Sequence, residues 1–541
     1  MLMKTNYPFY DWMPKPIGVL ILLALFVPLF FSGGTYLSNI NEMAGGMGVL
    51  TENFQFLSLC ASIGMSMVFP FMLPYLQARN VKHVYLGGYT LLALLNGVCA
   101  VTENIPVLMA CCFLIGFIRV ALVLNTTFVI APYLLGIQTL DMFLYEPDSP
   151  EGAYKNDHAR TMLMPVLYCY ILCIVQFSNY VSAWVAYEFR WEYTYLLVMG
   201  MMLAAILLVS FTFCHAPTHR YHLPWRLLPD VLLLTLAMGA FCYIMVFGKT
   251  YDWFAQRSIC VAWAVMLVCG GGFLWLSAAV RQKRVLELGI FRYRYTWYGI
   301  GIFILLMLIN SSTLFVTTYL KMSTLSGNLE SATVSCWAIP GCVAGLVFTL
   351  ICVFRGVHFR YIYAAGFLLM LAANLYMFFH YQTMGVYEHT IPPTLLHYSG
   401  MLVLYSVTCA FAMKHLPIRY FATWLFLMVA VRNVVAPAIE TSVYGNWLQE
   451  RQQHYITRLV QDVRTDNPQS AARFMQVTRL GQLQGKDGME ASRLASTLMK
   501  GQVTLQATLV AMKDITGSTV WICLGSALAV LLMPYHRKEK T

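Results

Sequence analysis

The sequence predicts an all-α integral membrane protein with fourteen membrane-spanning helices. Its 541 residues are 59% hydrophobic and 11% charged, whereas a soluble domain carries roughly 25% charged residues. Apolar runs of about twenty residues recur along nearly the whole chain, and a helix of that length crosses a bilayer core of about 30 Å. The runs are too continuously apolar for the alternating strands of a membrane barrel, so helices are the expected spanning structure.

The apolar runs define the expected helices. The first run follows Lys4 and Lys15 and has no clean small-residue cleavage site, so it is interpreted as a membrane helix rather than a signal peptide. We expect helices at 17–38, 51–76, 82–101, 106–134, 161–187, 192–213, 226–248, 258–280, 295–320, 331–354, 359–380, 393–413, 417–444 and 512–534.

The distribution of basic residues predicts the topology. With the N-terminus in the cytoplasm, twenty Lys and Arg residues lie in the tails and short loops of the inner side. The short outer loops hold four, namely Arg190, Lys249, Arg257 and Lys321. This asymmetry predicts a multi-pass protein of the bacterial inner (cytoplasmic) membrane with both termini in the cytoplasm. The net charge of +11 then reflects topology, and nucleic acid is not an expected partner.

Two polar segments interrupt the apolar pattern. One is the acidic inner loop at about 136–160. The other, 445–511, is placed outside, and apolar residues recur in its first part at helical spacing up to Asp466-Asn467-Pro468, where a helix should end. A second helical stretch, from Ser470 or from Met489, leads back to the membrane. We therefore expect an outer helical hairpin.

Three loop segments together carry a family resemblance. They are Arg281-Gln-Lys-Arg-Val-Leu-Glu-Leu-Gly-Ile-Phe-Arg-Tyr-Arg294, the stretch from Arg451 to Pro468, and Gly501-Gln-Val-Thr-Leu-Gln-Ala-Thr-Leu-Val-Ala-Met-Lys-Asp514. In order and spacing they resemble loops of the fourteen-helix drug:proton antiporters of the major facilitator superfamily, the EmrB/QacA-like group.

The resemblance implies a fold and a function. The fold is the major facilitator fold, with six-helix bundles at 1–213 and 295–541 and a central helix pair at 226–280. The function is secondary active efflux by alternating access. As in relatives of that group, the hairpin could dock a periplasmic adaptor and an outer-membrane channel, although a cap that stiffens two helix ends is an equally simple role.

The chain departs from that group where the group couples transport to protons. Gly33 stands where the group has an Asp, and Cys112 stands where it has an Arg. The antiporter Gly-Pro motif falls on Gln176–Val181, which does not match it. The resemblance therefore implies the fold but leaves proton antiport open.

Arg119 is the first charged residue expected at membrane depth, where a charge is costly and marks a candidate site. It lies seven residues after Cys112, so both side chains point to nearly the same helix face. Two interpretations stay open. Arg119 either meets a substrate or a carboxylate in a cavity, or it reaches the interface or holds a neighbouring helix end.

The helix expected at 417–444 contains Arg432, Asn433 and Glu440. Eight residues turn a helix by about 80° beyond two full turns, so Arg432 and Glu440 do not stack directly. Glu440 is the acidic residue best placed for proton coupling, because an apolar site favours the protonated carboxyl. The alternative is a static ion pair between Arg432 and Glu440 or with another helix.

Further polar residues in the membrane helices either line a cavity or join helices by hydrogen bonds, which is the commoner role. Those singled out as candidates are Glu42, Gln176, Asn179 and Asn310. Well inside the expected helices there are two arginines, Arg119 and Arg432, and one carboxylate, Glu440. This buried set is richer in Arg than in carboxylate, so it favours neutral or anionic substrates over lipophilic cations.

No motif for a nucleotide, a metal or a catalytic nucleophile is found. His215, His219 and His222 are interpreted as part of a basic loop rather than a metal site. We therefore expect no metal, no cofactor and no enzymatic activity. The favoured function is export of a small amphipathic or toxic compound, with protons as the candidate coupling ion. The alternatives are a non-transporting sensor or scaffold on a transporter fold, and an integral-membrane enzyme.

Overall fold

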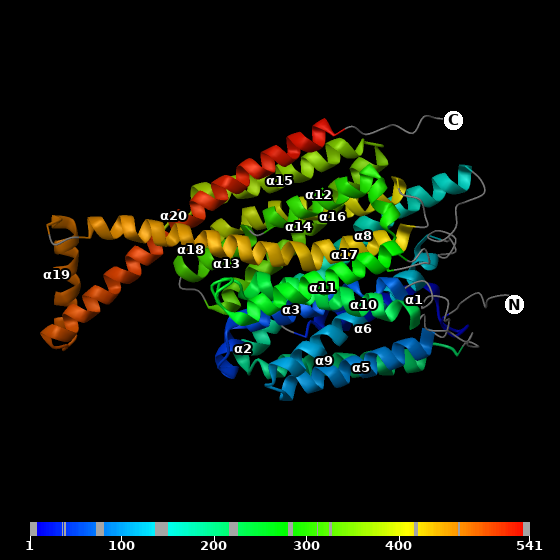
Figure 1. The fold of residues 1–541 in the computed structure, drawn as a ribbon, viewed down its shortest axis with the longest axis horizontal. Coiled ribbons are helices and arrows are strands. Elements are labelled where there is room, and N and C mark those ends of the chain that lie inside the picture. The colour runs from blue at the N-terminus through cyan, green and yellow to red at the C-terminus, as the bar shows by residue number, and fades with distance from the viewer. Residues whose placement is uncertain are drawn as a thin grey trace.

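The computed structural model describes residues 8–34, 36, 39–71, 81–135, 150–215, 225–279, 285–310, 312–323, 327–415, 420–463 and 466–533. In this part of the chain the helices lie side by side in an elongated bundle, and three helical segments project from one end (Figure 1). We call this the hairpin end. The opposite end, where α1 begins and α20 finishes, is called the terminal end (Figure 1).

The helices fall into three consecutive groups. The N-terminal half contains α1 (Lys15–Phe31), α2 (Ile40–Met47), α3 (Thr51–Ser66), α5 (Val81–Val101), α6 (Ile105–Leu135), α8 (Pro150–Glu188) and α9 (Glu192–Thr212). The central pair is α10 (Leu228–Phe247) and α11 (Arg257–Ala279). The C-terminal half contains α12 (Arg294–Asn310), α13 (Ser312–Ser323), α14 (Asn328–Phe354), α15 (Phe359–His380), α16 (Ile391–His415), α17 (Phe421–Ala430), a π turn (Val431–Val435), α18 (Ala436–Asp462), α19 (Pro468–Leu483) and α20 (Gly488–Leu532).

Every expected helix range overlaps a helix of the structure. Among the described residues, 12 helices are long and apolar enough to cross a membrane by length and composition. The 17-residue α1 is shorter, and α16 is not among the twelve. The all-helical membrane fold is thus confirmed, whereas the number of fourteen crossings stays a prediction.

The expectation of one helix over 17–38 is wrong, because α1 ends at Phe31 and the described residues that follow it, 32–34 and 36, are not helical. Gly34 has a φ of 76°, in the left-handed region that favours glycine. A Cβ there would lie 3.0 Å from the Cys112 Sγ atom, so the irregular segment passes close to α6. The hydropathy pattern does not indicate this break, because Gly33 and Gly34 both lie inside an apolar run.

One other expected boundary is also wrong. Residues 150–160, expected as loop, form the start of α8, which begins with Pro150 at the first helical position. Residues 136–149 of that expected loop lie outside the described residues. The segment 445–511 is helical, as expected, but in three pieces. These are the end of α18, α19, whose N-terminus is capped by the Asn467 side chain, and the beginning of the 45-residue α20.

Two hydrophobic cores support the two halves. One is made of residues between Phe9 and Phe213. The other joins residues of the C-terminal half and the central pair to α3. The halves meet where α8 packs against α14 and α16, and where α3 packs against α17. A site formed by residues of both halves is therefore expected along these helices.

Candidate functional site

The site is built around the π turn between α17 and α18. The turn contains Arg432 and Asn433, and Pro437 follows it. Proline has no N–H group to bond the carbonyl one turn back, which weakens the regular α-helical pattern at this point. A π turn inside an α-helix widens the backbone and is frequent at functional sites.

Arg432 lies between tyrosines of both halves. Its Nε atom donates to the Asn433 Oδ1 atom at 3.0 Å, and its Nη1 atom donates to the Tyr168 hydroxyl at 3.3 Å. The guanidinium carbon lies 5.6 Å from the ring centre of Tyr168 on α8 and 5.2 Å from that of Tyr405 on α16. These are cation–π distances, so the charge of Arg432 is stabilised by aromatic faces.

No carboxylate forms an ion pair with Arg432 within the described residues. Glu440 is buried, with 7% of its surface exposed, and within the described residues no ion pair or hydrogen bond joins it to Arg432. Of the alternatives considered for these two residues, the direct Arg432–Glu440 ion pair is not found in the described structure. A partly buried guanidinium that has only neutral partners still has donors suited to a carboxylate, phosphate or sulfate group.

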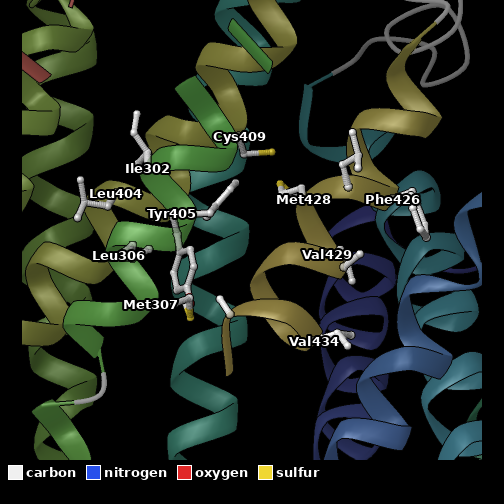
Figure 2. Close-up of a cluster of buried hydrophobic side chains, with 14 of the residues drawn as sticks. Ile302, Leu306, Met307, Leu404, Tyr405, Cys409, Phe426, Met428, Val429 and Val434 are labelled. Atoms are coloured by element: carbon white, nitrogen blue, oxygen red, sulfur yellow. The ribbon is translucent and has the colours of Figure 1, made fainter. Parts of the chain in front are cut away.

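The side chains packed around the Arg432 site are apolar and rich in sulfur. Figure 2 shows Met307 and Cys409 on either side of Tyr405, with Met428 facing them from α17. The Tyr405 hydroxyl donates to the Met307 Sδ atom at 3.7 Å, and the Tyr168 hydroxyl donates to the Met428 Sδ atom at 3.8 Å. Thioether side chains are polarizable and adapt to varied apolar shapes, which suits the apolar part of an amphipathic ligand.

Arg119 lies apart from this site and contacts the break in α1. Its Nη1 atom donates to the carbonyl oxygen of Ser32, the C-cap of α1, at 3.1 Å, and its Nη2 atom lies 2.9 Å from the Met65 Sδ atom. A helix C-terminus carries partial negative charge and favours a cation. Two interpretations of Arg119 were open, a cavity arginine or one that reaches the interface or a neighbouring helix end. The contact in the structure is with a neighbouring helix end.

The same break collects other side-chain donors. Asn96 donates to the Ser32 hydroxyl at 2.9 Å, Tyr195 to the Gly34 carbonyl at 2.7 Å, and Tyr36 to the Phe31 carbonyl at 3.2 Å. Irregular backbone at membrane depth is tolerated only where such partners satisfy it. Arg119 is therefore one member of a network that supports the end of α1.

The remaining candidates are not gathered at Arg432. The Glu42 carboxylate accepts from Asn328 of α14 at 2.9 Å and so links the two halves at the hairpin end. The Asn310 Oδ1 atom lies 3.1 Å from His397 Nε2, and the Gln176 side chain is buried. Asn179 accepts from Ser182 only through its backbone carbonyl, at 3.0 Å.

A small cavity adjoins His397 and Tyr398. Its volume is about 60 Å³, and residues of α13, α14, α15 and α16 line it, among them Asn374. A cavity of this size holds a few water molecules at most. It is therefore too small for the amphipathic compound that the sequence predicts.

Sequence reasoning missed two residues that the structure places at these contacts, Tyr168 and His397. Both lie inside apolar runs, where hydropathy counts them as ordinary helix positions. His397 could have been noticed, because a histidine followed by Tyr398 within the first two turns of a membrane helix is unusual.

Metal ligands are not brought together in the described part of the chain. No group of three or more His, Cys, Asp or Glu side chains there could hold a metal ion. The expected basic loop is described only in part, since His219 and His222 lie outside the described residues.

The comparisons with known proteins concern the fold. No family model matches the sequence, and no curated protein matches it. Among solved structures, the chain is similar to a POT family transporter in complex with 5-aminolevulinic acid (13% identity, 96% of this chain and 98% of that chain, TM-score 0.50). It is also similar to the peptide transporter POT in complex with sulfate (11%, 95% and 96%, 0.50) and to the nucleoside transporter NupG (10%, 91% and 98%, 0.48).

At identities this low the similarity shows the fold alone. The chain is an all-α membrane protein with the major facilitator fold. The two reported structures with a TM-score of 0.50 are POT family transporters, so they support the resemblance at the level of that fold and not at the level of the EmrB/QacA-like group.

Proposed function

We propose that this chain is a secondary active transporter that moves a small amphipathic compound with an anionic group by alternating access. The observation that carries the proposal is Arg432, which contacts Tyr168 from one half and Tyr405 from the other and has no anionic partner within the described residues. An anionic substrate group would supply that partner, and the sulfur-rich apolar walls would receive the rest of the molecule.

The position of Arg432 between the halves suits alternating access. A ligand shifts a conformational equilibrium only if it binds one state better than the other. When the halves rock, α8 moves relative to the π turn, so the contact between Arg432 and Tyr168 changes. Two of the similar structures hold ligands with an anionic group, 5-aminolevulinic acid and sulfate, which agrees with this substrate class.

Contacts at the hairpin end indicate how one side of the site is closed. Glu42 accepts from Asn328 across the halves, and the Lys249 ammonium donates to the Gly445 carbonyl of α18 at 3.0 Å. Thr250 donates to Glu52 of α3 at 3.5 Å, so the loop after α10 touches both halves. These exposed or partly buried polar contacts are weak enough to break during opening.

In this proposal residues 1–213 and 295–541 form the two moving bundles and residues 226–280 form the pair between them. Glu440 carries the coupling proton, because it is buried on the continuous helical run that also contains Arg432. Export, an inner-membrane location and cytoplasmic termini follow from the charge asymmetry and the family resemblance.

The hairpin, residues 445–511, is proposed as the docking point for a periplasmic adaptor. The experiment is a pull-down with the full chain and with a deletion of residues 450–505. If the deletion keeps the same captured proteins and the same transport rate, the hairpin is a stiffening cap and not a docking point.

Flux measurements in liposomes that contain the purified chain test the transport proposal. Three dansyl derivatives of similar size serve as probes: a carboxylate, its primary amide and a tertiary amine. With an imposed proton gradient, the carboxylate should move at least tenfold faster than the amine, and Arg432→Gln should remove that preference. Equal rates for all three in liposomes with and without the chain would favour the sensor or scaffold alternative.

A further inference from the structure

A second concave surface lies between the central pair and the N-terminal half, and Arg432 does not line it. It is an open groove of about 710 Å³ between α3 and α6 on one wall and α10 and α11 on the other. On α10 it extends from Thr235 to Tyr243, which is about 12 Å along the helix axis. Its volume is typical of a ligand site, and it opens toward the surroundings of the membrane helices.

The walls of this groove are almost entirely apolar. Phe56 and Ile63 of α3, Phe113 of α6 and Val261 of α11 are among the lining residues. Gly239 of α10 contributes no side chain, and a Cβ added there would meet nothing within 4 Å. The groove therefore has room along α10 for a flexible hydrocarbon chain.

Polar groups gather where α11 begins. Arg257, the first residue of α11, is exposed, lines the groove and forms no hydrogen bond or ion pair with the described residues. The next residue, Ser258, also lines the groove, and its hydroxyl is buried without a hydrogen-bond partner in the described part of the chain. The N-terminus of a 23-residue helix adds partial positive charge at the same place.

We propose that this groove binds an anionic phospholipid. One acyl chain lies along Gly239 between α3 and α10, the phosphate group pairs with Arg257 at the start of α11, and a headgroup or ester oxygen accepts from Ser258. A guanidinium prefers phosphate because it can donate two parallel hydrogen bonds. The site is independent of the transport proposal, since none of the residues that line it belongs to the Arg432 site.

Two pairs of variants test the two parts of the lipid separately. Gly239→Leu places a side chain in the groove, and Gly271→Leu is its control, because Gly271 of α11 also has nothing within 4 Å of an added Cβ but does not line the groove. Arg257→Gln removes the headgroup partner, and Arg479→Gln makes the same change on the exposed surface of α19.

The measurement is native mass spectrometry of the full chain in detergent. Phosphatidylglycerol and phosphatidylcholine with identical acyl chains are added in equal amounts. We expect the wild type and both controls to retain phosphatidylglycerol about tenfold over phosphatidylcholine. Arg257→Gln should bring that ratio close to one, and Gly239→Leu should lower retention of both lipids about tenfold.

Two results would overturn the proposal. Equal retention of both lipids by the wild type would mean only ordinary lipid contact, and an unchanged ratio in Arg257→Gln would remove Arg257 from the site. If Gly239→Leu unfolds, as judged by circular dichroism, the ratio in Arg257→Gln still decides the question.

Discussion

The two arginines near the middle of the bundle have opposite kinds of surroundings. Arg119 donates to the carbonyl that ends α1, within a network that includes Asn96 and Tyr195. Arg432 contacts the side chains of two tyrosines and its own neighbour Asn433. The first arginine completes the backbone bonding of the fold, and the second has donors that a ligand can use.

The difference shows that the unfavourable free energy of placing a charge in the membrane is offset in two ways in one molecule. At Arg119 the negative end of a helix substitutes for an anion. At Arg432 aromatic faces hold the charge in place with neutral partners, which leaves the electrostatic need for an anion unmet. The following variants are ordered from the largest expected effect on transport to the smallest.

Arg432→Gln should reduce flux of the dansyl carboxylate about 100-fold, because a hydrogen bond to a charged group contributes about 1.5–3 kcal/mol. The same variant should change the free energy of unfolding by less than about 1 kcal/mol, since no backbone group loses its partner. Flux in liposomes and denaturation of the purified chain measure the two quantities. A large loss of stability with unchanged flux would assign Arg432 to the fold, like Arg119.

Glu440→Gln should lower the substrate accumulation that a proton gradient drives at least about tenfold, while exchange of labelled for unlabelled substrate continues. The reason is that an amide retains the shape of the carboxyl but cannot take up and release a proton. Comparing gradient-driven uptake with exchange in the same liposomes separates coupling from binding. Full gradient-driven uptake in this variant would remove Glu440 from the mechanism.

Arg119→Met should lower stability more than it lowers flux, which is the opposite of what is expected for Arg432→Gln. It leaves the Ser32 carbonyl without its charged donor, which costs about 1–3 kcal/mol of stability, while flux at a temperature below the unfolding transition changes by less than about threefold. Methionine keeps much of the side-chain volume against Met65. Loss of flux without loss of stability would mean that Arg119 also meets the substrate.

Asn96→Ala tests the weaker part of the same network. Its Nδ2 atom donates to the Ser32 hydroxyl at 2.9 Å and to the Leu92 carbonyl at 2.8 Å. Losing these neutral hydrogen bonds should lower stability by about 0.5–1.5 kcal/mol and leave flux unchanged. The control is Ser518→Ala, which removes a hydroxyl that donates to the carbonyl of Asp514 in its own helix. An equal loss of stability in both variants would mean that the α1 break needs no support from Asn96.

The helix positions could be predicted from the sequence, because about twenty apolar residues in a row have few alternatives in a membrane. The break after Phe31 could not, since it depends on backbone dihedrals at Gly34 and on donors from α5, α6 and α9. Arg432 was recognisable as a charge at membrane depth. Its aromatic surroundings were not, because Tyr168 lies 264 positions away in the sequence.

The hairpin end and Arg432 are mechanically connected. From Phe421 the chain continues as one helical run to Asp462, so α18 reaches from Arg432 into the hairpin, and it is tied to α20 there by the 3.3 Å ion pair between Arg451 and Asp514. The π turn is the place in that run where the winding can change by one residue. Resetting it to an α turn would rotate everything beyond it by about 100°. A twist of the hairpin would therefore turn the Glu440 side chain toward another face of the helix, without shifting the position of the helix itself.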